Sequence, residues 1–154
     1  MKPANLIVTF FFIGYAKIAP GSIASLATAV LFYLFAKHLI FYLLIIIILL
    51  ITIISFFAIS IYTNDFLEKD KSEIVIDEVI GQSIALSPLL LFAETSPPGL
   101  YMCLISLLIF RFFDIIKPYP ITKFDKMNNT FGVIFDDILA GIFSALVLTL
   151  TLIF

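Results

Sequence analysis

The chain has 154 residues, of which 62% are hydrophobic and 13% charged, and its mean hydropathy is +1.19. A water-soluble domain is typically about half apolar and a quarter charged, so this composition indicates a membrane protein. The net charge of −2 argues against a nucleic-acid partner, and the single cysteine, Cys103, excludes an intramolecular disulfide.

The amino-terminal part begins with an apolar stretch from Leu6 to Ile13. We expect no cleavable signal peptide, because no small-residue cleavage site follows this stretch and its positive region is one lysine. Pro20 and Gly21 then break the chain, and Ser22 is predicted to cap a helix that runs to Ala36. The backbone amides at the start of that helix would face an incoming anion.

Apolar residues gather in five runs along the chain, each a candidate membrane segment. Only one run reaches the roughly 20 residues that a helix needs to cross a bilayer unaided. The others would need flanking polar positions, a locally thinned bilayer or a re-entrant path. We therefore expect an all-α fold, a polytopic bundle formed by one domain over residues 1–154. The runs are Ile23 to Ala36, Leu39 to Tyr62, Val79 to Ala93, Leu100 to Phe110 and Ile138 to Phe154.

Basic residues fall almost entirely on one side of the bilayer if each run crosses once. Eight of the nine precede the first run, separate the second from the third, or separate the fourth from the fifth; only Lys37 lies opposite. The positive-inside rule then predicts a multi-pass protein with a cytoplasmic amino terminus, five crossings and a carboxy terminus outside. The eight residues are Lys2, Lys17, Lys69, Lys71, Arg111, Lys117, Lys123 and Lys126.

Two acidic pairs, Asp77-Glu78 and Asp136-Asp137, stand where apolar segments begin. A structural reading is available, because carboxylates stabilise the amino terminus of a helix. Gly81 and Gly141 each follow an acid by four residues, which predicts a bare patch one turn away where a helix or ligand could approach.

The fourth segment ends in a charged motif. Arg111, Asp114 and Lys117 are spaced by three residues and share one face of a helix. Pro118 and Pro120 stop that helix, so Lys117 lies at its last turn. With the alternation of the runs, this motif and both acidic pairs converge at the cytoplasmic surface.

Hard oxygen ligands in this number, without a usable imidazole or thiolate, suit Mg²⁺. The only histidine, His38, is expected on the opposite side of the membrane, which excludes a histidine nucleophile or a Ser-His triad. Arg111 and Lys117 supply cations for a phosphate group. The reaction that remains is attack by water at that phosphate, assisted by carboxylate-held Mg²⁺. Asp77, Asp136 and Asp137 are the first candidates as metal ligands, with Glu78 or Asp114 as ligand or general base. Arg111, Lys117 and Ser22 are predicted to bind the phosphate.

Four sequence blocks carry a resemblance to the phosphatidylglycerophosphatase A family, over nearly the whole chain. The resemblance implies Mg²⁺-dependent removal of the terminal phosphate of phosphatidylglycerol phosphate at the cytoplasmic face of the bacterial inner membrane. It also implies that the family's acidic motifs fall on both pairs and Asp114, and its basic motifs on Arg111 and Lys117. The blocks are Ile18 to Leu26, Asp77 to Gln82, Phe110 to Ile121 and Gly132 to Gly141.

Two other classes remain open at this stage. Carboxylates inside membrane spans often lie on ion paths, so a cation or proton transporter is the alternative function. The clustering of the acids toward one face argues against it. A third class, a small scaffolding subunit, would not explain why Arg111, Asp114 and Lys117 share one helix face. The oligomeric state is not determined by the sequence.

Overall fold

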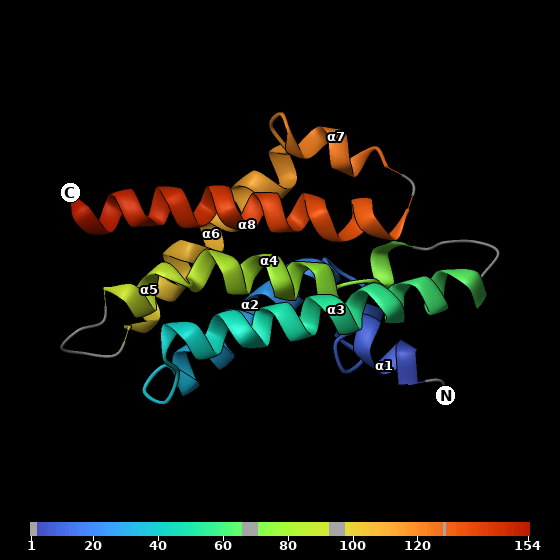
Figure 1. The fold of residues 1–154 in the computed structure, drawn as a ribbon, viewed down its shortest axis with the longest axis horizontal. Coiled ribbons are helices and arrows are strands. Elements are labelled where there is room, and N and C mark those ends of the chain that lie inside the picture. Colours follow the sequence, from blue (N-terminus) through green and yellow to red (C-terminus); the bar gives the residue numbers. More distant parts are fainter. Residues whose placement is uncertain (1–2, 66–70, 93–97, 128) are drawn as a thin grey trace.

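The computed structural model describes residues 3–65, 71–92, 98–127 and 129–154, and within these ranges the chain is helical and contains no strand (Figure 1). The expected all-α fold is therefore confirmed. Two short 3-10 turns, Ile13–Tyr15 and Lys71–Glu73, connect some of the helices. The helices are α1 (Pro3–Val8), α2 (Pro20–Phe35), α3 (Phe41–Asp65), α4 (Ile76–Leu86), α5 (Pro88–Leu91), α6 (Leu100–Ile116), α7 (Ile121–Asp125) and α8 (Thr130–Ile153).

Two of the described helices are long and apolar enough to cross a membrane, namely α3 over Phe41–Thr63 and α8 over Thr130–Ile153. Large apolar side chains on α3, such as Leu49, Ile53 and Phe57, are more than half exposed. Exposed apolar side chains of this kind on a long helix favour contact with lipid over contact with water. The two helices thus indicate association with a membrane. The other predicted segments fall on shorter helices, so the five-crossing topology stays a prediction.

Two helix boundaries differ from the sequence prediction. Helix α2 begins at Pro20, with Ala19 as its N-cap, so the predicted capping role of Ser22 is wrong. Proline fits the first helical position because its missing N–H would have no partner there. Most of the predicted run from Val79 to Ala93 falls on α4, which begins at Ile76, and on α5, and these two helices are divided at Ser87. Pro88 cannot donate to the helical ladder, which explains the division.

The end of α6 and the start of α8, which flank the charged segments, are each defined by a hydrogen bond. Helix α6 ends at Ile116, and Lys117 adopts a left-handed conformation while its N–H donates to the carbonyl of Phe113 at 2.8 Å. Helix α8 begins two residues before Gly132, because the side chain of Asn129 accepts a hydrogen bond from the N–H of Gly132 at 2.8 Å.

Helices α4 and α8 pack in direct backbone contact at two glycines. A Cβ atom on Gly141 would overlap the carbonyl oxygen of Gly81, and one on Gly81 would meet the carbonyl of Asp137 and the ring of Phe110. Only glycine permits this approach. The predicted bare patches are therefore occupied by the neighbouring helix. Each glycine lies one turn after an acid, so the contact also brings Asp77 and Asp137 together.

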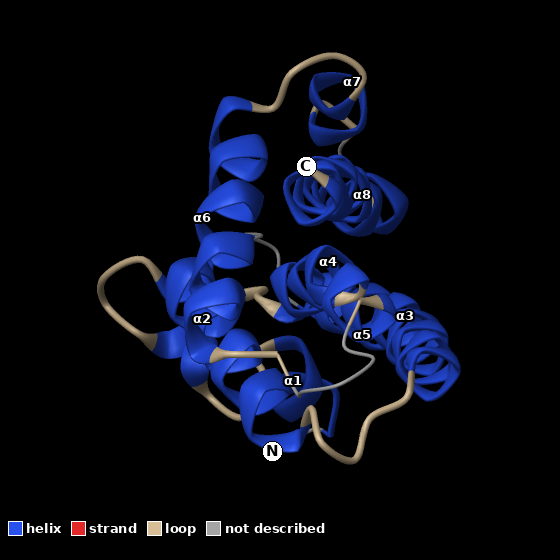
Figure 2. Ribbon diagram, turned by 90° about the vertical axis from the view of Figure 1, so that its left-hand side faces the viewer, coloured by secondary structure: helices blue, strands red, loops and turns tan. Residues whose placement is uncertain are grey.

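The arrangement of the remaining helices completes one polar end of the bundle. Helices α4 and α8 start at the same end of the molecule, and α3 runs in the opposite direction beside α4 (Figure 1). Seen along these three helices, α6 lies across them and packs on α2 and α8 (Figure 2). The last turn of α6 and the short helix α7 consequently lie near the first turns of α4 and α8.

We predict that Gly141→Ala lowers the free energy of unfolding by about 1–3 kcal/mol, because the added methyl group overpacks the contact with Gly81. Chemical denaturation in detergent measures the change. Gly99→Ala is the matched control, since a Cβ at Gly99 meets no atom within 4 Å and its backbone is extended. A Gly141→Ala protein as stable as the wild type would contradict the proposed close contact.

Candidate metal and phosphate site

Three carboxylates form the centre of the site. Asp77, Glu78 and Asp137 each offer an oxygen, and these oxygens lie within 4.8 Å of one another. Asp77 and Asp137 are buried, and Oε2 of Glu78 has no hydrogen-bond partner in the part of the chain that the structure describes. At an effective dielectric constant of about 20, each ionised pair at this separation repels by about 3 kcal/mol. A cation between the three groups would remove that cost.

The cluster opens into a polar cavity of about 190 Å³ at the end of the bundle. Six carboxylates and one ammonium group supply its charged lining, and no histidine or cysteine is among the lining residues in the described ranges. The cavity thus offers hard oxygen donors, which suit a divalent cation such as Mg²⁺. Its lining residues are Ile74, Asp77, Glu78, Asp114, Lys117, Asp125, Val133, Asp136 and Asp137.

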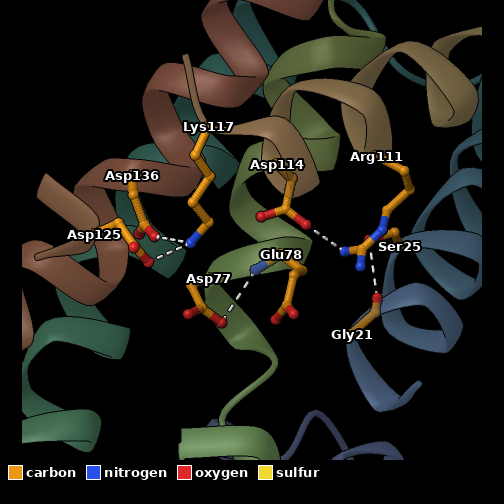
Figure 3. Close-up of polar contacts among 9 residues, drawn as sticks. All are labelled: Gly21, Ser25, Asp77, Glu78, Arg111, Asp114, Lys117, Asp125 and Asp136. Carbon is orange, nitrogen blue, oxygen red and sulfur yellow. Dashed lines mark hydrogen bonds and ion pairs between the residues drawn. The ribbon is translucent and has the colours of Figure 1, made fainter. Parts of the chain in front are cut away.

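Lys117 supplies the positive charge of the cavity. Its Nζ atom donates to Oδ1 of Asp125 at 2.5 Å and to Oδ2 of Asp136 at 2.8 Å (Figure 3). Burial alone would lower the pKa of Lys117, but the two hydrogen-bonded carboxylates outweigh it and raise the pKa above its ordinary value. The ammonium group therefore stays charged at neutral pH. Oδ1 of Asp136 is buried without a hydrogen-bond partner among the described residues.

Arg111 and Asp114 form an ion pair on α6, with Nη1 of the guanidinium 2.6 Å from Oδ2 of the carboxylate (Figure 3). This pair confirms that the two residues share a helix face, as their spacing predicts. Asp114 lines the cavity, whereas Arg111 lies behind it, and Nε of Arg111 is buried without a hydrogen-bond partner in the described part of the chain. The dipole of α6 disfavours an acid near its end, and Arg111 offsets that effect.

The first turn of α2 packs against Glu78. A Cβ atom on Gly21 would overlap Oε1 of Glu78, so a larger residue here would require the Glu78 carboxylate to move. The next turn is tied back, because the hydroxyl of Ser25 donates to the carbonyl of Gly21 at 2.9 Å (Figure 3). Ser22 is half-buried in this turn but is not among the residues that line the cavity. Its predicted role in phosphate binding stays a prediction.

The structure thus gathers most of the predicted site residues around one cavity and adds Asp125, which the sequence analysis did not select. Asp125 lies at the end of α7, and its side chain is 44% exposed. Nothing in its local sequence separates it from an ordinary surface acid. The only available signal is its position eight residues after Lys117, beyond a proline turn that folds α7 back onto α8.

These features define a class of protein. Two long apolar helices indicate a membrane, and one end of the bundle holds buried carboxylates, a charged lysine and a cavity with room for a small anion. Buried carboxylates beside fixed cations are typical of enzymes that act on phosphate groups with a divalent metal.

Comparison with known proteins identifies the family. The model of the phosphatidylglycerophosphatase A family matches residues 6–152, so the chain belongs to that family and is a lipid phosphatase. Phosphatidylglycerophosphatase A of Haemophilus influenzae is 32% identical over 96% of this chain and 87% of its own length. The same-named protein of Escherichia coli is 32% identical over 94% of this chain and 80% of its own. A Bacteroides thetaiotaomicron protein named as a putative phosphatidylinositol-3-phosphatase is 31% identical over 90% of this chain and 87% of its own. No solved structure matches the chain.

We predict that Glu78→Gln weakens binding of Mn²⁺ or Mg²⁺ by at least about tenfold, because the loss of even an outer partner at a metal site costs that much. Titration calorimetry on the purified protein measures the affinity. Glu73→Gln is the matched control: Glu73 accepts a hydrogen bond from the hydroxyl of Tyr62 and does not line the cavity. Equal affinities for Glu78→Gln and the wild type would exclude Glu78 from the metal site.

Proposed function

We propose that the protein catalyses Mg²⁺-dependent hydrolysis of the terminal phosphomonoester of phosphatidylglycerol phosphate, giving phosphatidylglycerol and phosphate. The observation that carries the proposal is the juxtaposition of Asp77, Glu78 and Asp137 in a cavity that also contains the ammonium group of Lys117. Family membership and the names of the relatives from H. influenzae and E. coli support this substrate. The B. thetaiotaomicron relative makes a phosphorylated inositol lipid the second candidate.

Asp77, Glu78 and Asp137 would hold the metal, with Asp136 as a further ligand candidate next to them. Their oxygens fit a hard divalent cation, and the partnerless Oε2 of Glu78 and Oδ1 of Asp136 leave acceptor capacity for it. Bound Mg²⁺ supplies positive charge for the phosphate and lowers the pKa of a coordinated water.

The chain's own groups take the other roles. Lys117 carries a fixed positive charge in the cavity and donates to a phosphate oxygen. Arg111 holds Asp114 at the cavity wall, where its carboxylate can accept a proton from the attacking water. Glu78 is the alternative base if it does not bind the metal. Ser22, in the first turn of α2, is proposed to contact the headgroup near Gly21.

The phospholipid nature of the substrate agrees with the apolar surface around the site. A cavity of about 460 Å³ lies between α2, α3 and α4, and its lining includes Val79, the residue after Glu78. The hydroxyls in its wall are satisfied within their own helices, since Thr28 donates to Ala24 and Ser83 donates to Val79. The other lining residues apart from His38 are apolar, so most of this wall favours contact with hydrocarbon.

We also propose the membrane arrangement. A single domain over residues 1–154 spans the bacterial inner membrane with five apolar segments, some short or re-entrant, and the polar cavity faces the cytoplasm. The shared orientation of α4 and α8 and the distribution of lysines and arginines support this arrangement. A transporter is less well supported, because the long helix α3 contains no acidic or basic residue from Phe41 to Thr63.

We predict that purified protein releases phosphate from phosphatidylglycerol phosphate with Mg²⁺ and loses this activity in chelator. Asp137→Asn should reduce kcat by at least about 100-fold, because its carboxylate is part of the ligand set. Phosphatidylinositol 3-phosphate, assayed in parallel, decides between the two candidate substrates by the ratio of kcat/KM.

The control for Asp137→Asn is its thermal unfolding in detergent, which should stay close to that of the wild type. Activity that persists in chelator would refute the metal-dependent mechanism. Wild-type turnover by a folded Asp137→Asn protein would remove the proposed site altogether.

A further inference from the structure

Asp125 has a place in the site that its sequence context does not explain. Its carboxylate is 2.5 Å from Nζ of Lys117, and it lines the polar cavity together with Asp136. The side chain of Asp125 is 44% exposed and that of Asp136 is 9% exposed. Lys117 is therefore hydrogen-bonded to one partly exposed carboxylate and one largely buried carboxylate.

Helix α7, which carries Asp125, has only five residues but is held in place by contacts with α6 and α8. Ile121, at the start of α7, is fully buried in a small cluster with Phe110 and Ala140. The ring of Phe124 packs on Phe135 of α8, with 5.7 Å between the ring centroids. The hydroxyl of Thr122 donates to the carbonyl of Lys117, which ties α7 to the end of α6. The backbone of α7, which carries Asp125, is thus held in place by packing.

An ammonium group has three donors, and the described contacts of Lys117 use two of them. The third is left for a group inside the cavity. A lysine stem has four rotatable carbons, so a single carboxylate would not hold the ammonium in one place. With two carboxylates accepting from it, the ammonium group is restricted more closely, and its third N–H points away from both of them (Figure 3).

We propose that Asp125 is a positioning residue, which shares Lys117 with Asp136 and so holds the ammonium group where its third N–H meets an oxygen of the substrate's phosphate. This inference deepens the proposed function and depends on it for the identity of the lipid. Without Asp125, Lys117 moves onto Asp136 alone, and the phosphate loses a fixed donor.

Loss of the charge of Asp125 and loss of its positioning role would change phosphate binding in opposite directions. A carboxylate beside an anion site repels the anion, so removal of its charge alone would strengthen phosphate binding. The positioning role predicts the opposite result, and only when Lys117 is present. A double-mutant cycle between the two residues separates these effects.

The test measures binding of inorganic phosphate to the purified full chain in Mg²⁺ by titration calorimetry. Lys117→Met should weaken binding by at least about tenfold, because a charge-assisted hydrogen bond is lost. Asp125→Asn should raise the dissociation constant about fivefold, as expected for a half-exposed ion pair. In the Lys117→Met background, Asp125→Asn should leave the dissociation constant unchanged or lower it, because only the repulsion between Asp125 and the anion remains.

Two further variants distinguish the loss of the positioning role from a general loss of structure. Asp125→Glu keeps the charge and should stay within about twofold of the wild type. Lys126→Gln, at the exposed neighbouring position, should do the same and reports any general effect of substitution in α7. With the lipid substrate, Asp125→Asn should raise KM more than it lowers kcat.

Several outcomes would overturn the proposal: tighter phosphate binding in Asp125→Asn, equal effects of Asp125→Asn in both backgrounds, or no phosphate binding by the wild type. If the wild type binds phosphate and shows the coupling but releases none from phosphatidylglycerol phosphate, the proposed function fails while the role of Asp125 stands.

Discussion

The backbone contact between Gly81 of α4 and Gly141 of α8 is the constraint on which the site depends. Each glycine follows an aspartate by one helical turn. The contact that leaves no room for a Cβ atom at either glycine therefore also brings Asp77 close to Asp137. A larger residue at either glycine would separate the helices by the width of a side chain. The carboxylate cluster is thus a consequence of helix packing, and its geometry is set by backbone atoms that have little freedom to adjust.

Charge balance follows from that geometry. The cavity gathers six carboxylates around one ammonium group, with Arg111 paired to Asp114 behind the wall. Such a site repels a phosphate unless further positive charge is present, and the oxygens of Asp77, Glu78 and Asp137 offer the place for it. Lys117 faces two carboxylates and Arg111 faces one, so the cluster of Asp77, Glu78 and Asp137 carries the largest uncompensated charge of the site. The apolar surface beyond Val79 then suits the rest of a lipid.

Much of this arrangement was predictable from the sequence, because it follows local rules. The acid pairs early in α4 and α8, the glycines four residues later and the stop at Pro118 all follow such rules, and they predicted most of the residues that line the cavity. The N-cap of α2 was predicted wrongly, since Pro20 in the first helical position outweighs the capping preference of Ser22. Asp125 was not selected, because its role arises from the tertiary position of α7, which no periodicity encodes.

The central claim is that a divalent cation binds between Asp77, Glu78 and Asp137. An experimental structure of the protein with Mn²⁺, with the ion located by its anomalous scattering, tests it most directly. The account predicts an ion in contact with oxygens of all three side chains. An ion bound elsewhere, or three carboxylates too far apart to share one, would contradict it.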